Sequence, residues 1–316
     1  MKDSSGGNWV GKSRENNLGN RIFNVIISRF GLNPAYFVLF FAATQYTLLD
    51  KKSRKVIKEF RSRLGLKTTI LDYYRHFYSF GISLIDRYAY LLSEKSLFSY
   101  TFLREDVIAE YVSKGKGVIL LGAHMGNWEV AGNLLKERLN VRVNLLMYDA
   151  ESEETKKTFS RALSNRDVNI INITMVSPDS MIEIVNALRR GEIICMHGDR
   201  IMGNQRGRRI EFLGREALFP SGPFDIAAVT GAALIPFYAL KTSWKHYTFR
   251  AFDPVVIRYS DREERQKLIS AAMDAYVKTL ESVAKEFPCQ WYNFYDFWPD
   301  TISEGQLQVG QDWLAS

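Results

Sequence analysis

A histidine and a glutamate in the segment GAHMGNWE (122–129) could act together as an acid–base pair. The apolar run GVILLGAH predicts a buried strand that ends at His124, and the carboxyl ends of strands are where open α/β folds bind ligands. Glu129 falls in the first turn of a predicted helix, from which its carboxylate could bond to one imidazole nitrogen and leave the other to accept a proton. We therefore predict that His124 is a general base and Glu129 its orienting carboxylate.

This pair has no nucleophile of its own, because no serine or cysteine stands in a nucleophile elbow. The attacking group would then be a hydroxyl of the substrate, which favours direct transfer over a covalent enzyme intermediate. A structural interpretation remains open. A glutamate in a first helical turn stabilises any helix dipole, and a histidine at a strand end can simply be packed.

A second polar cluster, His197-Gly198-Asp199-Arg200, follows the apolar run EIICMHGD (192–199). Further arginines come shortly after it at positions 206, 208 and 209. A strand tip carrying Asp199 and Arg200, with Arg206 and Arg209 beyond, predicts an anion site for a phosphate or a developing oxyanion. The alternative is a solvated basic hairpin in which Asp199 and Arg200 form a local ion pair.

A third segment, FLGREALFPSGPF (212–224), leads into a helix of small residues. The amino end of such a helix offers backbone donors to an anion, and the apolar residues suit an acyl-chain groove, although ordinary core packing explains them as well. The predicted substrate-binding residues are Asn127, Arg206, Arg209, Phe212, Gly214, Pro220 and Gly222.

The elements that must position these residues alternate along the chain. Short runs rich in β-branched or aromatic residues occur at 117–124, 141–148, 169–173, 192–199, 233–241 and 247–257. Helical patterns lie between them, including 177–191, where Ser177 could cap the helix, and 262–286. This alternation predicts an α/β fold with a central mixed, largely parallel sheet flanked by helices. Residues 34 to 103 are interpreted as helices.

The chain has 316 residues, enough for one domain with an N-terminal extension, which we divide into a helical region (1–103) and a catalytic region (104–316). Its net charge of +7 favours an anionic partner such as a lipid surface. The two cysteines have no metal-site spacing or disulfide-dense context, which suits a reducing compartment.

The N-terminal region is predicted to associate with a membrane. Residues 30 to 49 carry no charge, and at about 1.5 Å per residue this length could just cross a bilayer core of about 30 Å. Polar residues interrupt the run, so it could instead lie in the interface or form a buried helix. The stretch 51–63 is dense in lysine and arginine, as expected next to an anionic cytoplasmic leaflet.

Taken in order, these motifs resemble those of the late acyltransferases of lipid A biosynthesis, within the lysophospholipid acyltransferase superfamily. The resemblance runs from about residue 9 to residue 298. It rests on His-x-x-x-x-Glu, the strand-end Asp with Arg, FLG, FP-x-GPF and the later IPF.

The resemblance implies an O-acyltransferase at the cytoplasmic face of a bacterial inner membrane. Its donor would be an acyl carrier protein or coenzyme A thioester, and its acceptor a lipid A-like glycolipid or related lipid. No metal, other cofactor or nucleic acid would be required. The family's histidine and acidic partner map to His124 and Glu129, and its downstream acidic and basic positions map to Asp199 and Arg200. Arg200 would then grip the donor's phosphopantetheine or an oxyanion.

Some residues depart from the family pattern and leave the acceptor open. The tip reads HGDR instead of an Asp-Gln type, and NWVGKSREN (8–16) and QWYNFYDFW (290–298) look more like a branch found beside aryl-polyene and flexirubin-type pigment genes. The family's intervening arginine could be Arg161 or Arg166. Two rival classes remain: a metal-dependent hydrolase with His124, Glu129, His197 and Asp199 as ligands, and a non-catalytic membrane-binding protein.

Overall fold

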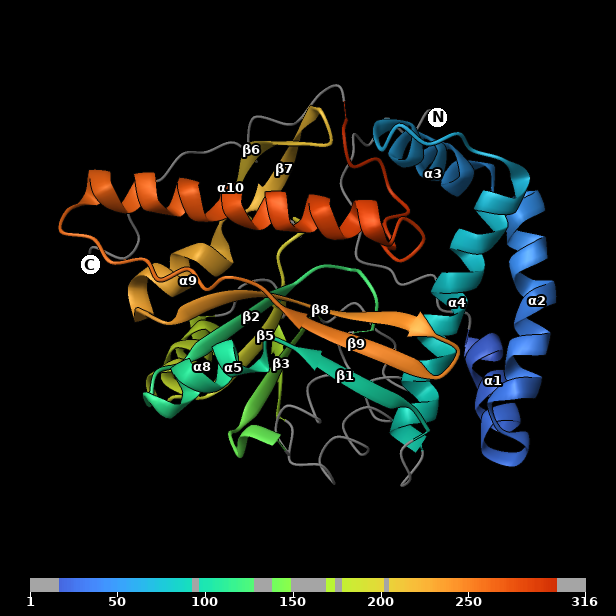
Figure 1. Ribbon diagram of the computed structural model, residues 1–316, viewed down its shortest axis with the longest axis horizontal. Coiled ribbons are helices and arrows are strands. Elements are labelled where there is room, and N and C mark those ends of the chain that lie inside the picture. Colours follow the sequence, from blue (N-terminus) through green and yellow to red (C-terminus); the bar gives the residue numbers. More distant parts are fainter. Residues whose placement is uncertain are drawn as a thin grey trace.

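The computed structural model describes residues 17–92, 97–127, 138–148, 169–173, 178–201 and 205–299 (Figure 1). Its helices are α1 (Asn17–Phe30), α2 (Leu32–Leu49), α3 (Lys51–Arg63), α4 (Ile70–Leu92), α5 (Glu105–Ser113), α8 (Pro178–Arg189), α9 (Gly222–Thr230) and α10 (Arg262–Glu286). Its strands are β1 (Ser99–Leu103), β2 (Val118–Gly122), β3 (Val143–Tyr148), β4 (Asn169–Ile173), β5 (Ile193–His197), β6 (Gly207–Phe212), β7 (Arg215–Pro220), β8 (Ala233–Ser243) and β9 (His246–Ala251).

The main sheet confirms the predicted mixed, largely parallel α/β architecture. Within the described residues it has seven strands in the order β1-β9-β8-β2-β5-β3-β4. Every neighbouring pair is parallel except β8 and β9, which are antiparallel. The central strand β2 is a run of buried apolar residues because helices cover both faces of the sheet.

The side chains of β2 alternate between two core clusters. Val118 and Leu120 belong to the cluster that contains residues of α1, α2, α4 and α5. Ile119 and Leu121 belong to the other, which contains residues of α8, α9 and α10 and of the β6–β7 hairpin. The period of two along a strand thus joins the N-terminal helices and the C-terminal helices to one sheet.

Two segments differ from the sequence-based prediction. Residues 99 to 103, interpreted as part of a helical region, form the edge strand β1, which pairs in parallel with β9. The segment 212–224, described above only as leading into a helix, contains the last residue of β6, the left-handed turn at Leu213 and Gly214, strand β7 and the start of α9. The helix predicted at 262–286 has those bounds as α10, and the one predicted at 177–191 is α8; Ser177 lies outside the described residues.

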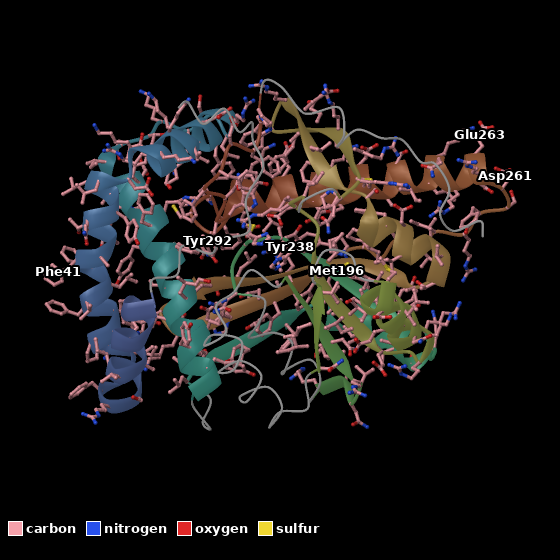
Figure 2. All side chains as sticks on the ribbon, turned by 180° about the vertical axis from the view of Figure 1, so that it is seen from behind. Phe41, Met196, Tyr238, Asp261, Glu263 and Tyr292 are labelled. Atoms are coloured by element: carbon pink, nitrogen blue, oxygen red, sulfur yellow. The ribbon has the colours of Figure 1, made fainter. Side chains whose placement is uncertain are left out.

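The helices α1, α2 and α4 lie together at one side of the molecule (Figure 1). Residues on one side of α2 are buried, among them Ala35, Tyr36 and Leu39, whereas aromatic residues on its other side are exposed. Phe41 is one of these and projects outward from the helix (Figure 2). None of the helices in the described ranges combines the length and the apolar character that a bilayer crossing requires.

A buried carboxylate ties these helices to the sheet. Asp86 of α4 accepts hydrogen bonds from the hydroxyl groups of Tyr36 in α2 and Tyr247 in β9. The ammonium group of Lys241 in β8 lies 2.5 Å from its Oδ2 atom. Burial raises the pKa of Asp86 and lowers the pKa of Lys241, and the attraction between the two opposes both shifts. Each of these polar groups would be costly to bury alone, so the cluster is stable only because the groups pair with one another.

A second buried ionisable group, His76 of α4, links stability to pH. Its ring lies 5.6 Å from the ring of Phe294, between centroids. Burial lowers the pKa of His76 to about 4, and the positive charge of Arg61 acts in the same direction. An unfolded histidine has a pKa of about 6.5. As the pH falls through this window, the unfolded chain takes up a proton that the folded chain excludes, so the stability present above pH 6.5 is lost progressively down to about pH 4.

We expect this residue to reduce the free energy of unfolding by about 2 kcal/mol between pH 7 and pH 5, at about 1.4 kcal/mol per unit of pH. Urea denaturation of wild type and His76→Gln at both pH values measures it. The pH-dependent loss should be smaller in the variant. The pKa of buried His197 is also lowered, but this group is present in both proteins, so their difference isolates His76. An equal loss in both proteins would contradict the assignment.

Candidate active site

The tips of β2 and β5 bring His124 and Asp199 together. These strands are parallel neighbours, and Gly122 stands opposite His197 in their register. Each of these two predicted site residues therefore follows its strand by two positions. The Nδ1 atom of His124 lies 2.8 Å from Oδ1 of Asp199, and the backbone N–H of His124 donates to Oδ2 at 3.0 Å.

Asp199 is a buried, ionised partner for the imidazole. Its side chain is 0% exposed, whereas that of His124 is 30% exposed. Burial alone would raise the pKa of Asp199, but the charge and hydrogen bond of His124, and then the charge of Arg200, outweigh it, so that the pKa lies below its usual range. A carboxylate without a proton can only accept, so Nδ1 must carry the proton and Nε2 is the accepting nitrogen of the ring.

The histidine ring of the strand tip, His197, packs against this pair. Its ring centroid is 4.3 Å from that of His124. Burial lowers the pKa of His197 well below the ordinary histidine value, and the charge of His124 adds to this shift. His197 is therefore a neutral ring beside His124. It limits the positions that the His124 imidazole can take and adds no charge to the pair.

The turn after His124 is held closely against the sheet and the C-terminal segment. Gly126 donates to the carbonyl of Gln290 at 3.0 Å, and Tyr292 donates to the carbonyl of His124 at 2.8 Å. Gly126 has a φ of +67°, and a Cβ atom there would lie 1.9 Å from the carbonyl oxygen of Ala239. Only glycine allows this approach, which fixes the backbone just beyond His124.

Comparison with known proteins identifies the family to which this arrangement belongs. The family described as bacterial lipid A biosynthesis acyltransferase matches residues 94–299, which include both strand tips and the C-terminal segment beside them. The chain belongs to the bacterial lipid A biosynthesis acyltransferase family. The resemblance predicted from the sequence motifs is thereby confirmed.

Curated relatives of this acyltransferase-family chain carry the name phosphatidylinositol mannoside acyltransferase. One from Mycobacterium tuberculosis (strain CDC 1551 / Oshkosh) is 21% identical over 200 residues, which cover 62% of this chain and 58% of the relative. One from Mycolicibacterium smegmatis is 22% identical over 200 residues, covering 62% of each chain. The matched region thus spans about three fifths of these relatives.

Two of the predicted site residues, Asn127 and Glu129, follow His124 closely in the sequence, but the structure describes only Asn127. Glu129, predicted as the orienting carboxylate, lies outside the described residues, so its role stays a prediction. Asn127, predicted to bind substrate, is buried: its Nδ2 atom donates to the carbonyl of Ser83 in α4 at 3.1 Å, and its backbone N–H donates to Ala239. In this position Asn127 joins the turn after His124 to α4.

Arg200 of this acyltransferase-family chain faces the C-terminal segment. Its guanidinium group donates to the carbonyl of Tyr292 at 2.5 Å and lies 5.5 Å from the ring centroid of Tyr295. Arg200 therefore contributes charge to the Asp199 carboxylate and also holds the segment that flanks the His124 turn.

The remaining predicted binding residues belong to the hairpin and to the start of α9. Arg206 and Arg209 are exposed, and Arg209 lies 3.7 Å from Glu216 across the hairpin. Phe212 is fully buried among aromatic rings, which include Trp291 at 5.4 Å and Trp298 at 5.8 Å between centroids. Gly214 forms the turn, Pro220 ends β7, and Gly222 begins α9.

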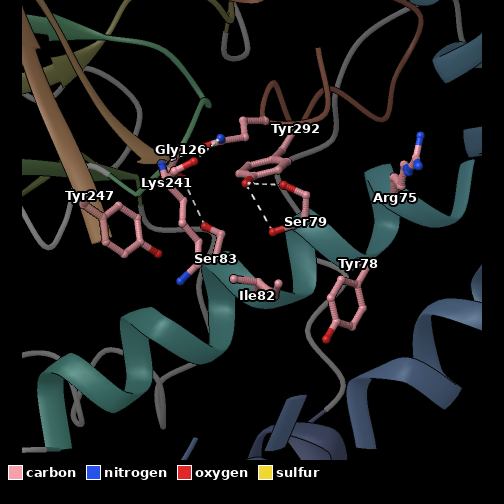
Figure 3. Close-up of a pocket in the computed structure, with 10 residues that line it drawn as sticks. Arg75, Tyr78, Ser79, Ile82, Ser83, Gly126, Lys241, Tyr247 and Tyr292 are labelled. Carbon is pink, nitrogen blue, oxygen red and sulfur yellow. Dashed lines mark hydrogen bonds between the residues drawn. The ribbon is translucent and has the colours of Figure 1, made fainter. Parts of the chain in front are cut away.

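A cavity of about 180 Å³ lies between α4 and the turn after His124. Figure 3 shows the side chains of Ser79, Ser83, Lys241 and Tyr292 around it. Gly126 contributes backbone to its lining, and its carbonyl accepts a hydrogen bond from Ser83 at 3.0 Å. These polar groups already have partners in the protein: Ser79 bonds to Tyr292, Ser83 to the Gly126 carbonyl, and Lys241 to Asp86.

The metal-ligand prediction for the rival hydrolase names four residues, of which Glu129 is not described. Among the described residues, no three His, Cys, Asp or Glu side chains gather as ligands of one metal ion would. Where the structure describes this region, Asp199 and His124 form a hydrogen-bonded pair, and the neutral ring of His197 packs against it.

Proposed function

We propose that this protein is an O-acyltransferase that moves a fatty acyl group from an acyl carrier protein or coenzyme A thioester to a hydroxyl of a lipid acceptor. The observation that carries the proposal is the 2.8 Å contact between His124 Nδ1 and the buried carboxylate of Asp199. This contact gives a partly exposed imidazole the tautomer that a general base needs. Family membership supports the same reaction class.

The proposed reaction is a direct transfer. The acceptor oxygen attacks the thioester carbonyl and forms the new C–O bond while Nε2 of His124 takes the hydroxyl proton. Asp199 stabilises the imidazolium ion that results. The tetrahedral intermediate then collapses, the C–S bond breaks, and the imidazolium returns its proton to the departing sulfur. No covalent enzyme intermediate is needed, because the attacking oxygen belongs to the substrate.

The identities of the donor and of the acceptor are proposed on chemical grounds. A net charge of +7 favours a donor with phosphate groups, as both acyl carrier protein and coenzyme A have. The names of the curated relatives support an acceptor with a hydroxylated headgroup. We propose a lipid A-like glycolipid, with an aryl-polyene or flexirubin-type lipid as the alternative. Gripping of the donor's phosphopantetheine by Arg200 also stays a proposal.

An acyl-transfer assay tests the function directly. Purified protein is given a radiolabelled acyl-acyl carrier protein or acyl-coenzyme A together with extracted lipids of the source cell. The expected result is label in a lipid product in the presence of one donor. A deletion strain should accumulate the same lipid lacking one acyl chain. Release of free fatty acid with no lipid product in any combination would instead support a hydrolase.

We also propose that the protein works at the cytoplasmic face of the inner membrane, held there by α2 and α3. The aromatic face of α2, defined as Phe37, Phe40 and Phe41, is exposed, with Phe37 at 68% and Phe41 at 57%. The next helix, α3, begins with exposed lysines and buries Ile57. Apolar rings beside a cationic helix surface suit the interface of an anionic bilayer, since rings can enter the acyl boundary while lysines meet headgroups.

Replacing Phe37, Phe40 and Phe41 by serine should weaken binding to phosphatidylglycerol vesicles by at least about tenfold. Full burial of one such ring contributes about 1.5–3 kcal/mol, and tenfold corresponds to about 1.4 kcal/mol. Co-sedimentation with vesicles measures the partitioning. Substitution is preferable to deletion of residues 1–50, because deletion would also remove Tyr36 from its bond with Asp86.

The matched control replaces Ile182 and Val229, which are exposed apolar residues on α8 and α9, by serine. Binding to vesicles should remain as in the wild type. If the triple α2 variant also bound as tightly as the wild type, the aromatic face of α2 would not be the membrane contact.

A further inference from the structure

The indole of Trp291 contacts the carboxylate of the dyad. Its Nε1–H donates to Oδ2 of Asp199 at 3.1 Å, and both side chains are almost completely buried. The same oxygen accepts the backbone N–H of His124, while the other oxygen accepts the His124 ring. Trp291 therefore supplies a donor on the side of the carboxylate that faces away from the imidazole.

The backbone around Trp291 pairs with the turn after His124, residues 124–126. Trp291 forms an antiparallel bridge with Met125. On either side of it, the carbonyl of Gln290 accepts from Gly126 N–H and the N–H of Tyr292 donates to the carbonyl of His124. The indole thus reaches Asp199 from a segment that also fixes the backbone of His124. A displacement of this segment would alter both ends of the dyad.

Aromatic packing determines the orientation of the indole. Its ring centroid lies 4.8 Å from that of Phe60 in α3, 4.9 Å from that of Phe297 and 5.4 Å from that of Phe212. These rings come from three separate parts of the chain. A side chain held on several sides keeps one rotamer, so its N–H has a fixed direction toward Asp199.

We propose that Trp291 is a positioning residue for the acyl-transfer reaction and acts through Asp199 on His124; this inference rests on the proposed function. The indole N–H holds the carboxylate in the plane of the imidazole N–H and shares its negative charge. Without this donor the carboxylate would rotate more freely, and its charge would act more fully on the imidazole, which would then hold a proton to higher pH.

Trp291→Phe tests the proposal, because it removes the indole N–H and keeps an aromatic ring. We expect kcat to fall about tenfold with KM nearly unchanged, as for other groups that orient a ligand or base from behind. The ascending limb of the pH–rate profile should move to higher pH. Loss of packing alone would not raise the proton affinity of the His124 imidazole, so this shift separates the two explanations.

A second readout does not depend on turnover. The chain has four histidines, so ¹⁵N-histidine NMR can follow each imidazole, and the His124→Ala spectrum identifies the signal of His124. The titration midpoint of that signal should rise by about half a pH unit or more in Trp291→Phe. This measurement decides the role of Trp291 even if no acceptor has been found, so its failure and that of the proposed function are distinguishable.

Trp298→Phe is the matched control. Trp298 is also buried in the aromatic cluster, but its Nε1–H donates to the carbonyl of Phe212 at 3.2 Å. Both variants lose one indole donor and similar volume, so both should lose similar stability, while only Trp291→Phe should move the His124 titration. An unchanged His124 titration in a folded Trp291→Phe protein, or equal shifts in both variants, would overturn the proposal.

Discussion

Replacing His124 by alanine is expected to lower acyl transfer by about 10²–10⁴-fold while the protein stays folded. The side chain is partly exposed at a strand tip, so its removal leaves little unfilled space in the core. The rate falls because the variant lacks the Nε2 atom that is proposed to take the acceptor's proton. Initial rates of transfer and the thermal midpoint of unfolding measure the two halves of this expectation.

Variants of Asp199 and Glu129 test which carboxylate orients His124. Asp199→Asn replaces the charged partner by a neutral amide, which should lower kcat more strongly than Glu129→Gln if the observed Asp199 contact is the catalytic one. His246→Ala is the control, because this histidine bonds to Ser99 and Thr101 at the sheet edge. A folded His124→Ala protein with normal transfer would refute the general-base mechanism and leave the family match as evidence of fold.

Asp86→Ala is expected to lower the free energy of unfolding by about 3–5 kcal/mol, the range for removing one partner of a buried ion pair. The variant leaves the Lys241 ammonium and the hydroxyls of Tyr36 and Tyr247 without the carboxylate that they share. Water would have to enter the core between α2, α4 and the sheet to replace the lost carboxylate. Urea denaturation at pH 7 measures the loss.

Asp253→Ala provides the control for this measurement. Asp253 also pairs with a cation, Arg104, at 2.7 Å, but its side chain is 88% exposed. Removing a surface pair should cost about 0–1 kcal/mol. If both variants lost the same small amount, Asp86 would not hold the N-terminal helices to the sheet. A double variant, Asp86→Asn with Lys241→Met, should recover part of the loss by removing the unpaired charge.

The central part of the fold could be predicted because its signals are local. The apolar runs that became β2 and β5 and the periodic pattern of α10 are readable from composition and spacing alone. The polar residues at the two strand tips were recognised in the same way. Their partnership could have been found too, since His124 and Asp199 each follow a strand by the same number of residues.

Other features depend on contacts that a single sequence does not display. The strand β1 alternates between exposed and half-buried residues, and it is a strand because β9, almost 150 residues later, pairs with it. Similarly, the motif around Trp291 was noted for its resemblance to one branch of the family, but nothing in its spacing indicates that the indole reaches Asp199. Such pairings follow from tertiary packing, which overrides local preference.

The register of β1 against β9 also constrains how the chain can assemble during synthesis. The edge strand leaves the ribosome long before its partner, and the indole that completes the dyad's surroundings comes later still. Contacts so distant in sequence close slowly, because a long loop must be ordered first. The helices α1, α2 and α4, by contrast, are made first and contact one another. Under the membrane contact proposed above, a nascent chain would bind a lipid surface through α2 before the segment that carries Trp291 docks beside Asp199.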